Sequence, residues 1–201
     1  MRVLIAEDDA VIGMGLAERL RDLGHEPIGP AGDGQEAIAM ALADPPDLYL
    51  FDVDLPGLDG LAAAAWLADA GLRRPIVVVT GIDDAEIIER SIANGAGACL
   101  TKPVDTRELD AAVRLAATRH AELQALEDDA DQARQELEER KIIERAKGLL
   151  MSALALSEAD AFRRLQLTAR ERNLRLIDVA RRIIEQERLL TPQPSQSRRS
   201  P

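Results

Sequence analysis

The chain has 201 residues, of which 46% are hydrophobic and only 2% aromatic, so its core must be built mainly from aliphatic side chains and alanine. A chain of this length forms one or two domains. No apolar run reaches the roughly 18 residues of a membrane-spanning helix, and the N-terminus lacks the apolar stretch of a secretory signal peptide. We therefore expect a cytoplasmic protein with no membrane partner. The single cysteine, Cys99, cannot form an internal disulfide and is expected to act as a small buried hydrophobic side chain.

The net charge of −11 counts against nucleic-acid binding by the chain as a whole, but the charge is unevenly distributed. Residues 1–105 carry 7 basic and 19 acidic side chains, a balance of −12. Residues 106–139 carry 4 and 10, a balance of −6, whereas residues 140–188 carry 12 and 7, a balance of +5. A basic C-terminal segment on an acidic protein predicts two functions in two domains.

Strand and helix patterns alternate through the first half of the chain. Short apolar runs predict five strands, at residues 3–6, 27–30, 48–51, 76–79 and 98–100. Helical patterns between the strands predict four helices, at residues 11–20, 35–42, 61–67 and 82–93. Continuous apolar strands that alternate with helices indicate a parallel sheet covered on both faces. The predicted fold class is α/β, a doubly wound five-stranded parallel sheet of the flavodoxin-like order 2-1-3-4-5, whose ligands bind beyond the carboxyl ends of the strands.

From Thr106 onward the pattern is helical, with no proline or glycine before Gly148. An apolar residue recurs every seven positions, at Leu109, Ala116, Leu123, Ala130 and Leu137. This spacing predicts a helical linker over residues 106–139 that overlaps the last helix of the first domain and carries an alanine-rich coiled-coil seam for a homodimer. The same pattern also fits an amphipathic helix lying on its own domain.

Three short helices are predicted after this linker. Residues 142–151 carry the first apolar stripe, Ser157 is the expected N-cap of the second helix, and Asn173 separates the second helix from the third. Phe162 is expected in the core between them. A glycine costs about 1 kcal/mol inside a helix, so Gly148 suggests close approach of another helix or of RNA. Residues 191–201, rich in Pro, Gln, Ser and Arg, predict a disordered tail.

Polar side chains gather at the carboxyl ends of the predicted strands, which open on one edge of a parallel sheet. They are Glu7, Asp8, Asp52, Asp54, Thr80 and Lys102. Two carboxylates about 5 Å apart repel by roughly 3 kcal/mol at an effective dielectric of 20, so this cluster needs a cation. Oxygen ligands without His or Cys favour Mg²⁺, and Mg²⁺ beside a carboxylate, a lysine and a hydroxyl is the set that phosphoryl transfer to an aspartate requires. Asp9 is expected to cap the next helix instead.

Four motifs in this order resemble the receiver family of two-component response regulators. They are Leu4 to Asp9, Leu50 to Gly60, Val78 to Gly81, and Leu100 to Pro103. The resemblance implies a receiver domain over residues 1–120, with a sensor histidine kinase as phosphoryl donor and no independent enzyme activity.

The same resemblance implies a role for each residue of the cluster. Asp52 is the phosphoacceptor, Thr80 the switch hydroxyl, and Lys102 the contact to the phosphoryl group. The implied Mg²⁺ ligands are Glu7, Asp8, Asp52 and the backbone carbonyl of Asp54. Cys99 stands where the family usually has an aromatic residue, so we expect the signal to pass through Thr80 and the following helix instead.

The segment from Arg140 to Met151, with its Ala146-Lys147-Gly148 triplet followed by Ala161-Phe162, resembles the ANTAR family. The resemblance implies a three-helix domain over residues 135–190 that binds paired hairpins in nascent RNA and prevents transcription termination. Single-stranded RNA is held by phosphate contacts and by stacking on aromatic or arginine planes. The candidate RNA-binding residues are Arg140, Lys141, Arg145, Lys147, Arg163 and Arg164.

Together these patterns predict a response regulator that binds RNA hairpins when Asp52 is phosphorylated, with phosphorylation-dependent homodimerisation through the long helix. The main alternative is a response regulator whose helical module docks on a partner protein. A DNA-binding output is less favoured, because no recognition helix follows a short turn.

Overall fold

The computed structural model describes residues 1–81, 89–92 and 95–190, and it divides into two compact units, Met1–Leu126 and Glu127–Pro201. The helix expected at residues 82–93 lies outside the described residues except for 89–92, which are helical. The tail expected at residues 191–201 lies outside them entirely. None of the helices in the described ranges is both long and apolar enough to cross a bilayer.

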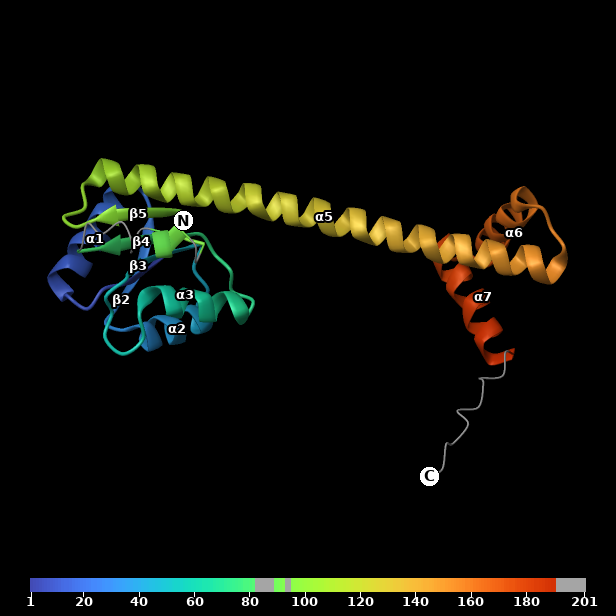
Figure 1. Ribbon diagram of the computed structural model, residues 1–201. Coiled ribbons are helices and arrows are strands. Elements are labelled where there is room, and N and C mark those ends of the chain that lie inside the picture. Colours follow the sequence, from blue (N-terminus) through green and yellow to red (C-terminus); the bar gives the residue numbers. More distant parts are fainter. Residues whose placement is uncertain (82–88, 93–94, 191–201) are drawn as a thin grey trace, which may run out of the picture. The chain divides into compact units, whose positions relative to one another are not determined.

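The N-terminal unit is built on a five-stranded parallel sheet in the order β2-β1-β3-β4-β5 (Figure 1). Its strands are β1 (Arg2–Ala6), β2 (Glu26–Ala31), β3 (Leu48–Asp52), β4 (Ile76–Thr80) and β5 (Ala98–Thr101). Strands β3 and β4 are buried along their whole length. Burial on both faces is the reason that central strands of a parallel sheet read as continuous apolar runs. The predicted fold class and strand order are confirmed.

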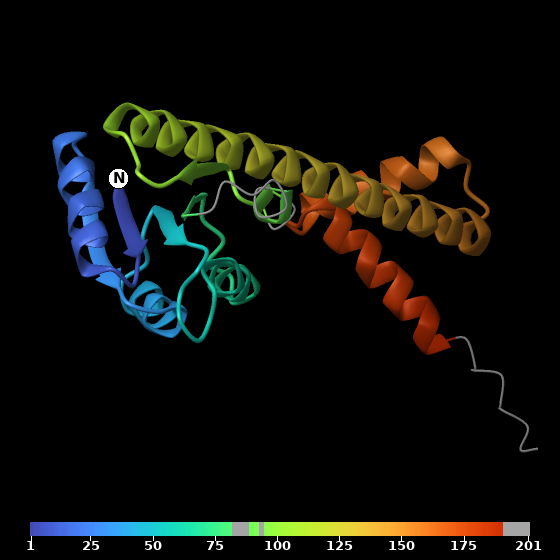
Figure 2. The ribbon, with the colours of Figure 1, turned by 60° about the vertical axis from the view of Figure 1, so that its left-hand side comes forward.

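Helices cover both faces of this sheet (Figures 1 and 2). On one face, α2 (Gly34–Ala43) and α3 (Gly60–Asp69) enclose a core that includes the stacked rings of Tyr49 and Phe51. On the other face, α1 (Ala10–Asp22) and the first turns of α5 (Thr106–Leu154) enclose a core of aliphatic side chains. These two layers hold the strand ends in a fixed order at the carboxyl edge of the sheet.

Two aspartates near that edge are N-caps of helices, Asp9 of α1 and Asp59 of α3. Asp9 Oδ1 accepts hydrogen bonds from the backbone N–H groups of Val11, at 2.8 Å, and Ile12, at 3.1 Å. Asp59 accepts a hydrogen bond from the N–H of Ala62 at 2.7 Å. Such N-caps satisfy donors that the first helical turn leaves unpaired. The expectation that Asp9 is a cap is confirmed.

The heptad pattern of α5 divides between two environments. Leu109 and Ala116 are 0% and 1% exposed, because they pack against the sheet of the N-terminal unit. Farther along the helix, Leu123, Leu126 and Leu137 are 61%, 65% and 54% exposed. The start of the predicted seam therefore belongs to the core of the first unit, as the amphipathic alternative had it, and only the part from Leu123 onward offers an uncovered apolar face.

The C-terminal unit packs the end of α5 against α6 (Glu158–Glu171) and α7 (Leu176–Leu190). Its small core includes Ala146, Leu165 and Val179, one residue from each helix. Ser157 caps α6 by accepting a hydrogen bond from the N–H of Asp160, and the backbone of Asn173 has a φ of 51° just past the end of α6. Asparagine tolerates this left-handed conformation better than most residues, so both predicted helix boundaries are confirmed.

One expectation for this unit is wrong, and another is reduced to one of its two alternatives. Phe162 is 36% exposed rather than in the core, because the buried stripe of α6 runs through Ala161, Leu165 and Ala169, and a helical residue next to such a stripe points about 100° away from it. For Gly148 the structure excludes one of the two alternatives: no other helix packs closely on it, because a Cβ atom added there would meet no atom within 4 Å outside its own helix backbone. Close approach of RNA to this exposed glycine stays a prediction.

Gly60 is different, because a Cβ atom there would overlap the carbonyl oxygen of Asp52. We expect Gly60→Ala to lower the free energy of unfolding of the N-terminal unit by about 1–3 kcal/mol, the usual cost of overpacking. Urea denaturation followed by circular dichroism measures this. The matched control is Gly15→Ala in the middle of α1, where the nearest atom is the flexible end of Arg19 and alanine should be neutral or stabilising. Equal stability of the two variants would contradict the prediction.

Candidate functional site

The carboxyl edge of the sheet brings together side chains that are far apart in the sequence. Asp52 ends β3 and Thr80 ends β4, and Asp52 pairs in register with Val79, next to Thr80. Glu7 follows β1 directly, and the N–H of Lys102, just past β5, donates to the carbonyl of Thr80 at 2.8 Å. The carboxyl ends of β1, β3, β4 and β5 therefore each place one residue in the same site, because parallel strands end at a common edge of the sheet.

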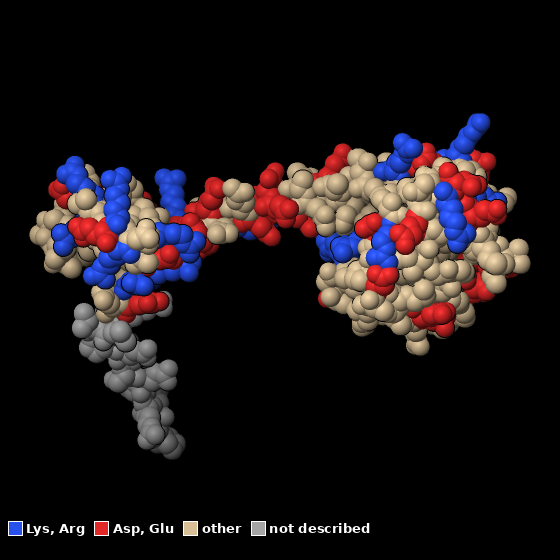
Figure 3. Space-filling model, turned by 180° about the vertical axis from the view of Figure 1, so that it is seen from behind, with Lys and Arg blue, Asp and Glu red and all other residues tan. Residues whose placement is uncertain are grey.

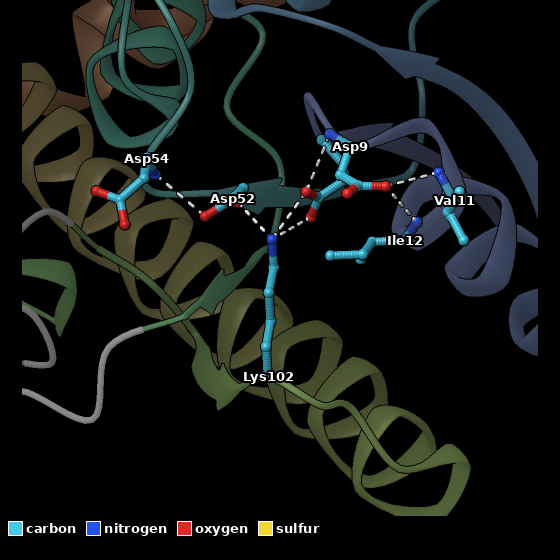
Figure 4. Close-up of polar contacts among 7 residues, drawn as sticks. Asp9, Val11, Ile12, Asp52, Asp54 and Lys102 are labelled. Atoms are coloured by element: carbon cyan, nitrogen blue, oxygen red, sulfur yellow. Dashed lines mark hydrogen bonds and ion pairs between the residues drawn. The ribbon is translucent and has the colours of Figure 1, made fainter.

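Lys102 lies between two buried carboxylates (Figure 4). Its Nζ donates to Asp52 Oδ2 at 2.6 Å and to Glu7 Oε1 at 2.8 Å. Asp52 Oδ1 accepts a hydrogen bond from the backbone N–H of Asp54 at 3.1 Å. Each oxygen of Asp52 is thus held by a different donor, which fixes the orientation of the carboxylate.

Burial and the neighbouring charges shift the pKa values of Glu7 and Lys102 in opposite directions. Asp52 and Glu7 are 4% and 2% exposed. Burial raises the pKa of Glu7 above its ordinary value, although the hydrogen bond from Lys102 opposes this shift. Burial alone would lower the pKa of Lys102, but its hydrogen bonds to Asp52 and Glu7 outweigh that effect and raise it. The lysine is consequently a fixed positive charge at neutral pH.

The carboxylate cluster fits a divalent cation. Glu7, Asp8 and Asp52 each offer one carboxylate oxygen, and these oxygens all lie within 4.8 Å of one another. Glu7 Oε2 lies 2.6 Å from Lys102 Nζ but outside hydrogen-bonding alignment, so this buried oxygen accepts no hydrogen bond. Three hard oxygen donors and an unsatisfied buried oxygen suit Mg²⁺. The carboxylate of Asp54 is not part of this cluster, so its predicted role through the backbone carbonyl stays a prediction.

Cys99 in β5 behaves as a small hydrophobic side chain. It is partly buried and packs against the core on the side of α2 and α3. Burial raises the pKa of its thiol, which reduces the thiolate fraction and hence the reactivity.

The C-terminal unit carries many basic side chains, whereas acidic side chains follow one another along the middle of α5 (Figure 3). Several of the cations nominated from the sequence already pair with carboxylates. Lys141 lies 2.7 Å from Glu138, Arg145 lies 3.7 Å from Glu187, and Arg163 lies 3.5 Å from Asp160. Within the described residues, Arg140 and Arg164 have no such carboxylate.

Lys147 is the least accessible of the nominated cations, with an exposed fraction of only 8%. Its Nζ lies 2.9 Å from Glu144 on the same helix and 2.8 Å from Glu158 in the first turn of α6. The same nitrogen lies 5.8 Å from the centre of the Phe162 ring, within the range of a cation–π contact. These contacts fasten the start of α6 to the end of α5. Sequence reasoning missed this role, because no spacing along the chain shows that Glu158 lies next to Lys147 in the folded unit.

The five-stranded parallel sheet with an acidic cluster and a lysine at its carboxyl edge is the arrangement of a response regulator receiver domain, here followed by a small helical module. A family model for the response regulator receiver domain matches residues 3–114, and one for the ANTAR domain matches residues 131–184. The chain belongs to the response regulators with an ANTAR output domain.

Known relatives share this architecture. The transcriptional regulatory protein PdtaR of Mycobacterium tuberculosis H37Rv is 44% identical over 184 residues, which cover 92% of this chain and 89% of PdtaR. Solved receiver domains resemble the N-terminal part of the chain. The receiver domain of a modulated diguanylate cyclase from Desulfovibrio desulfuricans G20 has a TM-score of 0.54 and 34% identity, covering 59% of this chain and 94% of that structure. The receiver domain of NarL from M. tuberculosis has a TM-score of 0.55 and 28% identity, covering 58% and 95%.

The charge on Lys102 should matter for folding even without phosphorylation. In Lys102→Met, Glu7 and Asp52 lose their shared counter-charge. We therefore expect the free energy of unfolding at pH 7 to fall by about 1–3 kcal/mol. This cost is smaller than that of breaking a fully buried ion pair, because Lys102 is partly exposed. The deficit should shrink as the pH falls toward 4.5, the ordinary pKa of glutamate, because a protonated Glu7 needs no counter-charge. Urea titrations in EDTA measure both effects. Lys141→Met, at an exposed ion pair, is the control and should change little. A deficit independent of pH would argue against this account.

The contacts of Lys147 predict coupling between two helices. We expect Lys147→Met and Glu158→Gln each to lower the urea midpoint of the C-terminal unit, and the double variant to lower it by less than the sum of the two, because both remove the same ion pair. The pair Lys141→Met and Glu158→Gln, which share no contact, should be additive. Additivity of the Lys147 pair would show that this ion pair does not connect the helices.

Proposed function

We propose that the chain is a phosphorylation-controlled RNA-binding antiterminator. A sensor histidine kinase supplies a phosphoryl group to Asp52, and the ANTAR domain then engages paired hairpins in nascent RNA. The observation that carries the first step is the buried Asp52 carboxylate, with one oxygen 2.6 Å from Lys102 Nζ, inside a cluster of three carboxylates.

The chemistry at Asp52 is a transfer between two nucleophiles. A carboxylate oxygen of Asp52 attacks the phosphorus of a phosphohistidine, the P–N bond breaks, and the released imidazole takes up a proton. Glu7, Asp8, Asp52 and the carbonyl of Asp54 would hold Mg²⁺, which when bound supplies positive charge to the transferring oxygens. Lys102 supplies a second positive charge, and the hydroxyl of Thr80 donates a hydrogen bond to the acyl phosphate once it has formed.

Phosphorylation competes for the contacts that Lys102 makes in the present structure. Once Asp52 carries a phosphoryl group, Lys102 gains a stronger acceptor than Glu7. Its backbone N–H is bonded to the carbonyl of Thr80, so a movement of Lys102 acts directly on the ends of β4 and β5. A bistable receiver responds to such a change by a shift of population rather than by gradual deformation.

The exposed part of α5 supplies the dimer contact. Leu123, Leu126 and Leu137 are more than half exposed, and a second copy of the helix would cover them at the spacing of a coiled coil. The surrounding residues are strongly acidic, so an unphosphorylated pair is opposed by repulsion. Phosphorylation would favour the state of the receiver in which two copies associate and present two ANTAR domains to two hairpins.

One observation favours the alternative, in which the helical module docks on a partner protein. Lys141, Arg145, Lys147 and Arg163 are occupied by carboxylates of the same chain. These ion pairs cancel part of the positive charge of the surface, so it should bind RNA phosphates more weakly than the number of basic residues in the sequence suggests. The RNA proposal therefore depends mainly on cations without such partners.

Asp52→Asn tests the proposal directly. With the phosphoryl mimic beryllofluoride and Mg²⁺, we expect wild type to dimerise and to bind a pool of paired stem–loop RNAs with randomised loops at least tenfold more tightly than without the mimic. Asp52→Asn should show neither response, because it offers no carboxylate oxygen for the adduct. Sedimentation and filter binding at stated salt measure the two effects. Equal RNA affinity of Asp52→Asn and beryllofluoride-treated wild type would contradict the switch.

A seam variant separates dimerisation from phosphorylation. Leu126→Lys with Leu137→Lys leaves the site at Asp52 intact and places charges on the uncovered face of α5. We expect this variant to accept the mimic but to remain monomeric and to lose the preference for paired over single hairpins. Preference for duplex DNA over hairpin RNA in any of these proteins would favour a DNA-binding output instead.

A further inference from the structure

A groove opens in the C-terminal unit where the end of α5, α6 and α7 meet. Its volume is about 260 Å³, just below the range of about 300–1,000 Å³ that is typical of pockets for drug-sized ligands. Leu150, Leu165 and Val179 line it with apolar surface, and Thr168 and Gln186 add polar groups. The groove is thus small and partly apolar, which suits one flat aromatic group better than an extended chain.

Three arginines line the same groove, Arg164 on α6, Arg172 just after α6, and Arg182 on α7. All three side chains are exposed. No acidic residue lines the groove, and across the described parts of the chain no carboxylate lies within ion-pair distance of these three guanidinium groups.

A second groove in the same unit provides a contrast. It is lined by Lys141, Arg145 and Arg181 but also by Glu185, and Arg145 pairs with Glu187. Positive charge that is not cancelled by acids is therefore concentrated around the groove that contains Arg164. A ligand that combines a flat apolar part with negative charge matches that surface.

We propose that this groove, which we call the arginine slot, receives an unpaired base from an RNA loop while Arg164, Arg172 and Arg182 contact the phosphates on either side. The proposal rests on the RNA-binding function above and assigns it a specific site. Unpaired bases are commonly recognised by stacking and by hydrogen bonds to their edges. The aromatic ring of this unit, Phe162, does not line the slot, so arginine planes take the stacking role.

The polar groups of the slot fit the recognition of a base edge. The side-chain amide of Gln186 offers both a donor and an acceptor. The hydroxyl of Thr168 donates to the backbone carbonyl of Arg164 at 2.9 Å, and this hydroxyl can still accept a hydrogen bond. Arg164 and Thr168 are four residues apart on α6, as are Arg182 and Gln186 on α7, so each helix presents one cation and one neutral polar group on the same side.

The test compares stem–loop RNAs with intact loops and the same RNAs with abasic loops, which keep the phosphates but lack the bases. The proteins are full-length and treated with beryllofluoride and Mg²⁺. For wild type we expect abasic loops to bind roughly 5- to 150-fold more weakly, the usual effect of one stacked base. In Arg164→Gln, the ratio of the affinity for intact loops to the affinity for abasic loops should fall toward one. The matched control is Arg170→Gln, which removes the same charge from the same helix outside the slot and should leave the ratio unchanged.

Thr168→Phe provides a second variant that keeps every arginine and fills the slot. It should also reduce the ratio toward one, while circular dichroism reports whether each variant is folded. A ratio that persists in both slot variants, or wild type that binds intact and abasic loops equally, would overturn the slot while leaving RNA binding in place. If no stem–loop RNA binds to wild type, the proposed function itself fails, and with it the slot; this is the outcome expected of a module that docks on a protein.

Discussion

The contact of Lys102 with Asp52 and Glu7 is the interaction on which the chemistry of the N-terminal unit depends. Two carboxylates that are almost fully buried repel each other, and they are tolerated only because a lysine from another strand lies within 2.6–2.8 Å of both. The same arrangement leaves Glu7 Oε2 without a hydrogen bond. One lysine offsets only part of the negative charge of this cluster, and the remaining negative charge is what the proposed divalent ion would balance.

The contact of Lys102 is connected to the neighbouring strand ends by direct hydrogen bonds. Lys102 is bonded through its backbone to Thr80 and through its side chain to Asp52. Just before β5, Gly97 allows close contact with α5, since a Cβ atom there would lie 2.7 Å from Ala116. The helix that begins on the receiver core is the same helix that contributes Ala146 to the core of the C-terminal unit. A single continuous element thus belongs to both cores.

The fold and the grouping of side chains at the candidate site could be predicted from the sequence because they depend on local patterns and on one topological rule. Apolar runs gave the strands, and the common carboxyl edge of parallel strands placed Asp52 beside Lys102. The C-terminal unit was harder to predict. Phe162 was expected in the core but is exposed, whereas Lys147 was expected on an RNA-binding surface but is buried. The buried side of a short helix depends on the helices that pack against it, and the periodicity of the sequence does not identify these. The heptads of α5 fitted both a dimer seam and packing on the receiver, and they could not show that Leu109 and Ala116 belong to the receiver core.

The burial of Lys147 also changes where RNA recognition should be sought. The lysine of the Ala-Lys-Gly triplet is almost fully buried and joins two helices through its ion pair with Glu158. If cations that pair with carboxylates stabilise the unit, then those without partners are the ones available to phosphates. Arg164, Arg172 and Arg182 meet this criterion and come from segments that only the folded unit brings together. The proposed RNA surface would therefore be a property of the packing of α5, α6 and α7 rather than of any one basic segment.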